Sequence, residues 1–236
     1  MTIVSDGAEI YWEEHGHGFP LIMLHGNGQS SSMFAGQSAF FSESRRVIAV
    51  DSRGHGKSSS SGKKLSLFDM AEDLIAVMDA AGIEKADILG FSDGGNISLI
   101  FAVKHPERVR SLILSGANSI PQGLKFGFFA AMRMKHALLT IGSLFSQKCR
   151  EEKDLLDLML NEPNLRSWDL ESIVVPTLIT AGENDLIRNG HTSYIAAMIK
   201  GSVKHIFPGD HFTPEKLPDE YNNVVQEFLN SVDSKG

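Results

Sequence analysis

Five short apolar runs constrain the fold of this chain more than any other feature. A strand with one face in water alternates apolar and polar residues, whereas a strand buried on both faces is apolar throughout, as in a parallel sheet covered by helices. Helical patterns separate the runs: residues 67–81 place apolar side chains at helical spacing, and Gly82 follows as a stop signal. The segment 8–14 resembles an edge strand instead. The sequence therefore predicts an α/β fold with a mostly parallel, doubly wound sheet. The runs are 21–24, 47–50, 86–89, 112–114 and 177–180.

One interval breaks this alternation of strands and helices. After the run at 112–114, the chain reaches no strand-like segment until about Val174, and residues 118–171 are far more than one crossover helix needs. Because 236 residues suit one large α/β domain, we predict a single domain over residues 1–236 with a helical cap inserted at about 118–171. Within this interval, 126–145 is rich in Phe, Met, Leu and Ala. These side chains either pack the cap onto the sheet or contact the substrate, and the first alternative is favoured.

The composition excludes several classes of partner. The formal net charge is −7 and the basic residues cluster only in pairs, at 45–46 and 63–64, so we expect no nucleic-acid partner. No apolar run reaches the ~18–20 residues that span a bilayer, and the first residues lack the pattern of a signal peptide. We therefore expect a cytoplasmic protein with no membrane partner. Cys149 is the only cysteine, which excludes an intramolecular disulfide and a cysteine-rich metal site.

Ser92 is the first candidate for chemistry. It lies in the sequence Gly-Phe-Ser-Asp-Gly-Gly at 90–95, between the apolar run at 86–89 and a helix-like stretch at 96–105. A strand that turns sharply into a helix needs small residues beside the turn, because a Cβ there would collide with neighbouring backbone. Ser92 in such a turn is either a nucleophile at the tip of a nucleophile elbow or an ordinary turn serine. The order of the segments that follow favours the nucleophile.

A serine hydroxyl needs a general base, and the base needs an acid to orient it. Asp185 follows the strand-like run at 177–180, and His211 follows the apolar pair at 206–207, so both are expected at the carboxyl edge of the sheet. The chain order is Ser, Asp, His, which predicts a triad of Ser92, Asp185 and His211. The competing carboxylates are Glu183 and Asp210, and the competing histidines are His191 and His205.

With these segments in order, the chain resembles the serine hydrolases of the α/β-hydrolase fold over nearly its whole length. The segment His-Gly-Asn-Gly at 25–28 is similar to the family's oxyanion loop, and Asp-Ser-Arg-Gly-His-Gly-Lys-Ser at 51–58 is similar to its Asp-x-Arg-Gly-x-Gly-x-Ser loop. The Ser-Asp-Gly-Gly form of the elbow is similar to that of biphenyl hydrolase-like proteins and related small esterases.

The resemblance implies hydrolysis of a small carboxylic ester through an acyl-enzyme, without a metal ion or organic cofactor. It also implies an oxyanion hole formed by the backbone N–H groups of Asn27 and Asp93. In this family the loop of Asp51 and Arg53 is mainly structural, and His25 is expected to form structural hydrogen bonds. The side chain of Asp93 is either held by local hydrogen bonds or attracts a cationic substrate amine, and the first alternative is favoured.

Other functions remain compatible with the same residues. The triad could hydrolyse carbon–carbon bonds, thioesters or amides, or catalyse perhydrolysis, and a non-catalytic binding or signalling protein could have the same fold. An intact triad argues against a pure binder, because binding does not require all three groups. The sequence leaves the substrate, the pocket-lining residues of the insertion and the oligomeric state open.

Overall fold

The computed structural model of the chain describes residues 1–234 and contains one sheet of eight strands in these residues. The strand order is β1-β2-β4-β3-β5-β6-β7-β8. Strands β3 to β8 run parallel, and β1 and β2 join the sheet antiparallel, so the predicted α/β fold with a mostly parallel sheet is confirmed. The strands are β1 Thr2–Ser5, β2 Ala8–His15, β3 Pro20–Leu24, β4 Arg46–Val50, β5 Ala86–Phe91, β6 Val109–Ser115, β7 Thr177–Gly182 and β8 Val203–Phe207.

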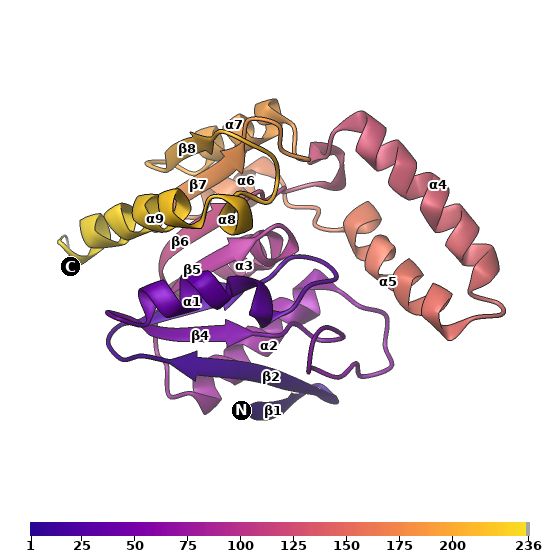
Figure 1. Cartoon of the computed structure of the whole chain (residues 1–236), viewed down its shortest axis with the longest axis horizontal. Coiled ribbons are helices and arrows are strands. Elements are labelled where there is room, and N and C mark those ends of the chain that lie inside the picture. Colours follow the sequence, from indigo (N-terminus) through magenta and orange to yellow (C-terminus); the bar gives the residue numbers. More distant parts are fainter. Residues whose placement is uncertain (235–236) are drawn as a thin grey trace.

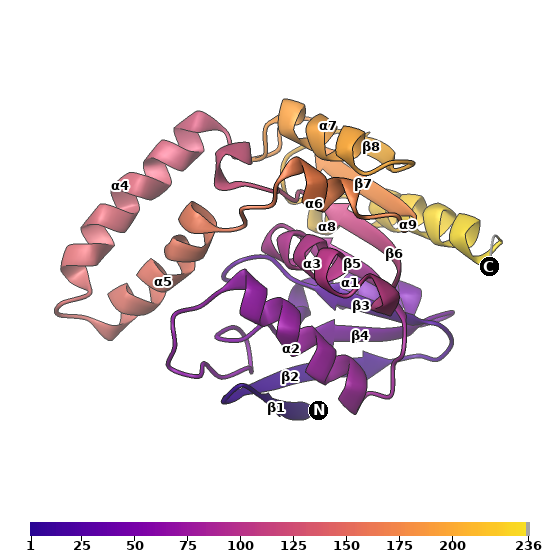
Figure 2. The ribbon, with the colours of Figure 1, turned by 180° about the vertical axis from the view of Figure 1, so that it is seen from behind.

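Helices cover both faces of this sheet (Figures 1 and 2). Side chains that alternate along each central strand enter two different cores. In β3, Leu21 and Met23 pack with α1 and α9, whereas Ile22 and Leu24 pack with α2 and α3. Burial on both faces explains why these strands are continuously apolar in sequence. The helices are α1 Ala35–Phe41, α2 Leu67–Ala80, α3 Asp93–Lys104, α4 Phe126–Gly142, α5 Gln147–Asn161, α6 Ser167–Glu171, α7 Asn189–Met198, α8 Thr213–Lys216 and α9 Pro218–Asp233; short 3₁₀ turns span Ser31–Phe34, Pro106–Arg108 and Pro121–Gly123.

All five predicted runs form strands of the sheet. The predicted helix at 67–81 is α2, which begins after Ser66, whose hydroxyl accepts the backbone N–H of Phe68, and which is followed by Gly82 with a φ of +65°. The expected edge position of residues 8–14 is wrong. This segment lies in β2, which pairs with β4 on one side and with the short strand β1 on the other. β1 and β8 are therefore the edge strands.

The interval between β6 and β7 contains an antiparallel pair of helices, α4 and α5, which extends away from the sheet (Figures 1 and 2). The aromatic residues of α4 do not pack onto the sheet as expected. Phe128 and Phe129 instead join Met132 in a separate cluster with residues of α5 and with Ile187. Phe126 and Phe145 are 84% and 86% exposed. The insertion reaches the core of the sheet at the end of α5, in the loop that follows and in α6, through Leu158, Leu165 and Leu170. None of the helices in residues 1–234 combines the length and apolar character needed to cross a bilayer.

Candidate active site

Ser92 lies at the turn between β5 and α3 in a backbone conformation that L-residues rarely adopt. Its φ is +53° and its ψ is −119°. The glycines beside the turn are required: a Cβ on Gly94 would lie 1.9 Å from the carbonyl oxygen of Leu24, and a Cβ on Gly90 would lie 2.3 Å from the carbonyl oxygen of Gly94. Backbone therefore approaches backbone on both sides of Ser92, and the structure has the tight strand-to-helix turn of a nucleophile elbow.

The structure brings Ser92, His211 and Asp185 into one line of hydrogen bonds. The Oγ atom of Ser92 lies 3.0 Å from Nε2 of His211, and Nδ1 of His211 lies 2.7 Å from Oδ1 of Asp185. A carboxylate can only accept, so Nδ1 carries the proton that is donated to Asp185. In the uncharged ring, Nε2 then presents its lone pair to the Ser92 hydroxyl. This is the protonation state that a general base requires.

Asp185 is held in place as an ionised carboxylate. Its side chain is buried and also accepts backbone N–H groups, from Ile187 at 2.9 Å and from Gly182 at 3.1 Å. Burial alone would raise the pKa of Asp185, but the hydrogen bond and charge of His211, together with the two backbone donors, hold that pKa below its usual value. Asp185 is therefore suited to orient His211 and to stabilise its imidazolium form.

The competing residues lie elsewhere. Glu183 is exposed, and Asp210 forms an ion pair with Lys216 on the surface. His205 lies in β8 with its ring against Phe207. The structure therefore does not bring these groups to Ser92.

His191 is buried against the start of the insertion and accepts the backbone N–H of Ser119 at 3.1 Å. Burial lowers the pKa of His191 to about 4, so its ring is neutral at neutral pH. Its position and hydrogen bond fit a packing role between α7 and this loop.

Gly116, which was not singled out in the sequence, shapes the site beside the histidine. It follows β6 with a φ of +61°, and a Cβ there would lie 2.7 Å from Cε1 of His211. Phe91 packs on the same ring, with ring centroids 4.9 Å apart. A glycine directly after an apolar strand was the only sequence signal for this contact, and many ordinary turns share it.

Asn27 and Asp93 lie close to each other beside Ser92. Among the described residues, neither backbone N–H donates a hydrogen bond, so both are available to an oxyanion. The side chain of Asn27 donates to Oδ2 of Asp93 over 2.9 Å, and Asn96 donates to Oδ1 over 3.0 Å. Burial raises the pKa of the Asp93 carboxyl, and these amide donors oppose that shift. Both oxygens of Asp93 are thus held by local hydrogen bonds.

The loop that carries Asn27 is braced by its neighbours. Nε2 of His25 accepts the backbone N–H of Ser52 at 3.0 Å, and Nδ1 donates to the carbonyl of Gly26 at 2.8 Å. Burial lowers the pKa of His25 to about 4, and both ring nitrogens are engaged, so His25 is a structural residue here. Gln29 spans from the backbone N–H of Gly26 to the carboxylate of Glu215 in α8.

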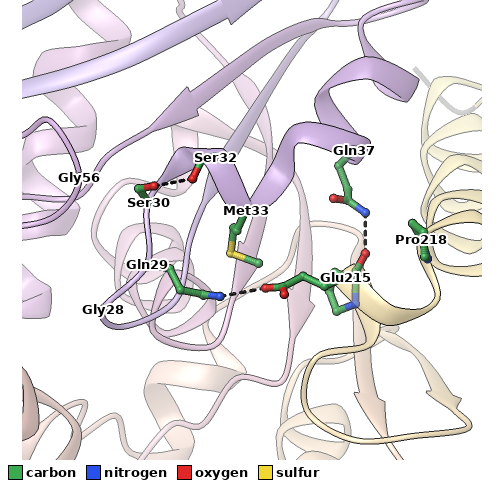
Figure 3. A pocket seen from close by; sticks show the side chains of 11 residues that line it. Gly28, Gln29, Ser30, Ser32, Met33, Gln37, Gly56, Glu215 and Pro218 are labelled. Atoms are coloured by element: carbon green, nitrogen blue, oxygen red, sulfur yellow. Dashed lines mark hydrogen bonds between the residues drawn. The ribbon is translucent and has the colours of Figure 1, made fainter.

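Figure 3 shows the bridge from Gln29 to Glu215 at a surface groove of about 680 Å³. The groove is lined by the loop after β3, the start of α1 and α8, and none of Ser92, Asp185 and His211 is among its lining residues. It therefore lies outside the hydrogen-bonded line described above.

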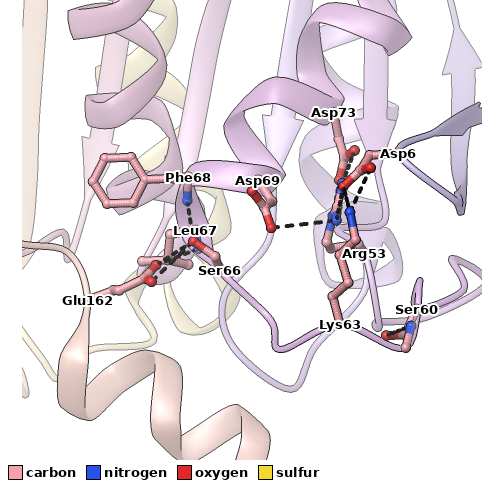
Figure 4. Close-up of polar contacts among 11 residues, drawn as sticks. Asp6, Arg53, Ser60, Lys63, Ser66, Leu67, Phe68, Asp69, Asp73 and Glu162 are labelled. Atoms are coloured by element: carbon pink, nitrogen blue, oxygen red, sulfur yellow. Dashed lines mark hydrogen bonds and ion pairs between the residues drawn. The ribbon is translucent and has the colours of Figure 1, made fainter.

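The loop at 51–58 is a structural support for this region. Asp51 accepts the backbone N–H groups of Ser31 at 2.6 Å and of Lys57 at 2.7 Å. Arg53 forms a bidentate ion pair with Asp73 of α2, with both contacts at 2.6 Å, and Asp6 and Asp69 lie nearby (Figure 4). Arg53 and Asp73 are both buried.

We expect Asp73→Ala to lower the free energy of unfolding by about 3 kcal/mol, because it leaves the buried Arg53 guanidinium without its bidentate partner. Urea denaturation of the purified protein would measure this change. The matched control is Asp79→Ala, because Asp79 is 62% exposed and pairs with Arg108 on the surface. The control should cost less than about 1 kcal/mol. Equal losses for the two variants would contradict a structural role of the Arg53 pair.

No group of three or more His, Cys, Asp or Glu side chains within residues 1–234 is arranged to hold a metal ion. The groups that are brought together at the carboxyl edge of the sheet are a serine, a histidine and a carboxylate, beside two backbone N–H groups with no partner among the described residues. This arrangement can activate a hydroxyl as a nucleophile and can stabilise a developing negative charge.

Comparisons with known proteins find related sequences and similar structures. A family model described as alpha/beta hydrolase fold matches residues 20–159. The chain is 28% identical to 2-hydroxymuconate semialdehyde hydrolase of Pseudomonas putida, over 98% of this chain and 94% of that protein. It is also 28% identical to the serine hydrolase BPHL of Mus musculus, over 96% of this chain and 85% of that protein. The structure of a variant of the meta-cleavage product hydrolase of Pseudomonas fluorescens IP01 superposes on this chain with a TM-score of 0.80. The two are 25% identical, and the match covers 98% of this chain and 97% of that protein.

Proposed function

The chain belongs to the α/β-hydrolase fold family and is a hydrolase, and from that premise we propose that it cleaves a small carboxylic ester through an acyl-enzyme. The observation that carries the proposal is the line of hydrogen bonds from Ser92 through His211 to Asp185. The side chains of this line have the order and spacing that nucleophilic catalysis needs.

In the proposed reaction, Oγ of Ser92 attacks the ester carbonyl while Nε2 of His211 takes the hydroxyl proton. The carbonyl electrons move to the oxygen, which the backbone N–H groups of Asn27 and Asp93 then stabilise. When the tetrahedral intermediate collapses, the bond to the alcohol breaks and His211 returns the proton to the leaving alkoxide. Water repeats the sequence on the acyl-enzyme, releases the acid and regenerates Ser92. Asp185 orients His211 throughout.

We also propose that residues 118–171 cap this site within a single domain of residues 1–236. Three contacts support the cap. The carbonyl of Leu155 in α5 accepts a hydrogen bond from Asn27, and Leu158 lines a small cavity together with Asn27 and Asp93. The loop before α4 is bonded to His191 through Ser119. The insertion therefore contacts the residues beside the nucleophile, where it can shape the substrate pocket.

Carbon–carbon bond hydrolysis is the second candidate, because one of the relatives is named 2-hydroxymuconate semialdehyde hydrolase. Both reactions begin with attack on a carbonyl, and they differ in the leaving group. An alkoxide needs only the proton that His211 holds, whereas a carbanion must be stabilised by the rest of the substrate. The line of three residues serves the ester reaction without further groups, so the ester is the first choice.

We expect a fluorophosphonate probe to modify the folded protein at Ser92, because the probe reacts with a serine that an adjacent histidine activates. Mass spectrometry of the labelled peptide would locate the adduct. Ser60→Ala is a matched control, since Ser60 is exposed and its hydroxyl accepts the backbone N–H of Gly62, and it should label like the natural chain. Failure of the folded natural chain to label would favour a non-catalytic protein on this fold.

The same preparation should be assayed with p-nitrophenyl esters of graded chain length and with a dienoate substrate of carbon–carbon hydrolases. Higher kcat/KM for an ester would support the proposal. Higher kcat/KM for the dienoate, with intact labelling at Ser92, would replace ester hydrolysis by the second candidate and leave the roles of the three residues unchanged.

A further inference from the structure

Asn27 connects three separate parts of the molecule through one side chain. Its Nδ2 atom donates to Oδ2 of Asp93 at the start of α3 over 2.9 Å, and to the backbone carbonyl of Leu155 in α5 over 3.0 Å. A primary amide has two N–H groups. Both are therefore engaged, one with the second residue of the oxyanion hole and the other with the inserted helix.

Asp93 is a fixed partner in this network. Its other carboxylate oxygen accepts Nδ2 of Asn96, which also donates to Oδ1 of Asn118 at 3.1 Å. Oδ1 of Asn96 in turn accepts the backbone N–H of Asn118 at 2.8 Å. Asp93 and Asn96 are both buried. A hydrogen bond to a carboxylate is stronger than one between neutral groups, so the hydrogen bond from Asn27 to Asp93 is a strong one.

The helix α5 is attached to the body of the protein along one face. Leu155 accepts from Asn27, Leu158 is buried in the core, and Glu162 lies one turn further. The Glu162 carboxylate accepts the backbone N–H of Leu67 at 2.7 Å and the hydroxyl of Ser66 at 3.1 Å, at the start of α2 (Figure 4). Leu155 and Leu158 lie on one side of α5, and Glu162 directly follows the helix, so its contacts fix the C-terminal end of α5 to the start of α2.

The backbone that follows Asn27 has little restraint of its own. Gly26 precedes it and Gly28 follows it, and Gly28 has a φ of +71° with open space where a Cβ would be. The carbonyl of Gly26, in the same peptide as the Asn27 N–H, accepts Nδ1 of His25 and the backbone N–H of Gln29. Because glycine backbone at position 28 is permissive, the side-chain contacts of Asn27 supply the restraint on the other side of this residue. A donor in an oxyanion hole must lie about 2.7–3.1 Å from the oxyanion, and a small displacement of this peptide would lose that distance.

We propose that Asn27 is a positioning residue. Through the contacts of its side chain, the geometry of the oxyanion hole depends on how α5 packs against the body of the protein. This inference rests on the proposed serine-hydrolase mechanism. The contact with Asp93 sets the two backbone donors relative to each other, and the contact with Leu155 ties them to the insertion. The hole is then fully formed when α5 is docked on the body, and it is loosened when α5 moves.

The test is a double-mutant cycle of Asn27→Ala and Glu162→Ala, measured as kcat and KM on the best p-nitrophenyl ester. Asn27→Ala keeps the backbone N–H but loses both side-chain contacts, and we expect kcat to fall about 10–100-fold with KM changed less than about threefold. Glu162→Ala loosens α5 without touching the oxyanion loop, and we expect it to lower kcat about 3–10-fold in the natural chain but less than about twofold in the Asn27→Ala background.

Two further variants separate positioning from packing. Asn27→Asp keeps the size of the side chain but turns an oxygen toward two acceptors, so it should lower kcat at least as much as Asn27→Ala. Asn223→Ala removes an exposed asparagine of α9 and should leave kcat and KM unchanged. Thermal melting of every variant would show that the losses in kcat arise in folded protein.

Equal effects of Glu162→Ala in both backgrounds, or unchanged kcat in Asn27→Ala and Asn27→Asp, would overturn the inference. A natural chain that neither labels at Ser92 nor turns over any substrate would instead refute the proposed function, and the inference with it. The two failures are therefore distinguishable from the natural chain alone.

Discussion

Ser92→Ala should lower kcat/KM for a small ester by about 10⁴–10⁶-fold, which is the scale expected when the nucleophile of such a triad is removed. In the described residues, Nε2 of His211 has no hydroxyl partner other than Ser92, so no second serine can take over the attack. Alanine fits the volume of the turn, and the neighbouring glycines are untouched. The free energy of unfolding should therefore change little.

The measurement is steady-state hydrolysis of a p-nitrophenyl ester by repurified Ser92→Ala, together with its melting temperature. Ser60→Ala, treated in the same way, controls for contamination and for the loss of a hydroxyl group. Residual activity above about 1% of the natural chain would contradict the assignment of Ser92, because the hole and substrate binding alone leave far less.

Asp185→Ala should lower kcat by about 10³–10⁴-fold, because His211 then loses the acceptor that fixes its tautomer and stabilises its imidazolium. The contact to be removed is the 2.7 Å hydrogen bond at Nδ1 of His211. With no acceptor there, the imidazole can carry its proton on Nε2 and rotate away from Ser92. Substrate binding does not use Asp185, so KM should change less than kcat.

Asp210→Ala is the matched control, since Asp210 directly precedes the histidine in sequence but pairs with Lys216 on the surface. It should change kcat by less than about threefold, as expected for the loss of an exposed ion pair. If the two aspartate variants lost kcat equally, the pairing of His211 with Asp185 would not be the contact that matters in solution. Because Asp185 also accepts two backbone N–H groups, the melting temperature of both variants is measured beside kcat to show that the loss arises in folded protein.

The sequence predicted the sheet and the line of three residues because local signals specify both. The continuous apolar runs follow from burial on two faces, and the carboxyl ends of parallel strands meet at one edge, which brings together Ser92, Asp185 and His211 from distant segments. The glycines beside Ser92 mark positions where backbone meets backbone. Such requirements depend on few neighbours, so a single sequence can carry them.

Other features depend on how separate elements are placed in space. The hydrogen bond from Asn27 to Leu155 joins residues 128 positions apart, and nothing near either residue signals it. The outer position of β1 depends on its pairing with β2, which displaced residues 8–14 from the edge. The packing of Phe128 and Phe129 within the insertion depends on the direction in which α4 and α5 leave the sheet. An apolar pattern predicts that a side chain is buried, but it does not predict which residues that side chain packs against.

Ser92, the proposed nucleophile, has a backbone conformation that is unfavourable for a residue with a side chain. Apart from Asp6, Ser92 is the only described residue other than glycine with a positive φ. A residue in such a region costs about 1–3 kcal/mol, and glycine would avoid most of it. Selection for thermal stability alone would therefore favour glycine at this position and would discard the hydroxyl. A serine at this position is what we expect if Ser92 is the nucleophile that we propose.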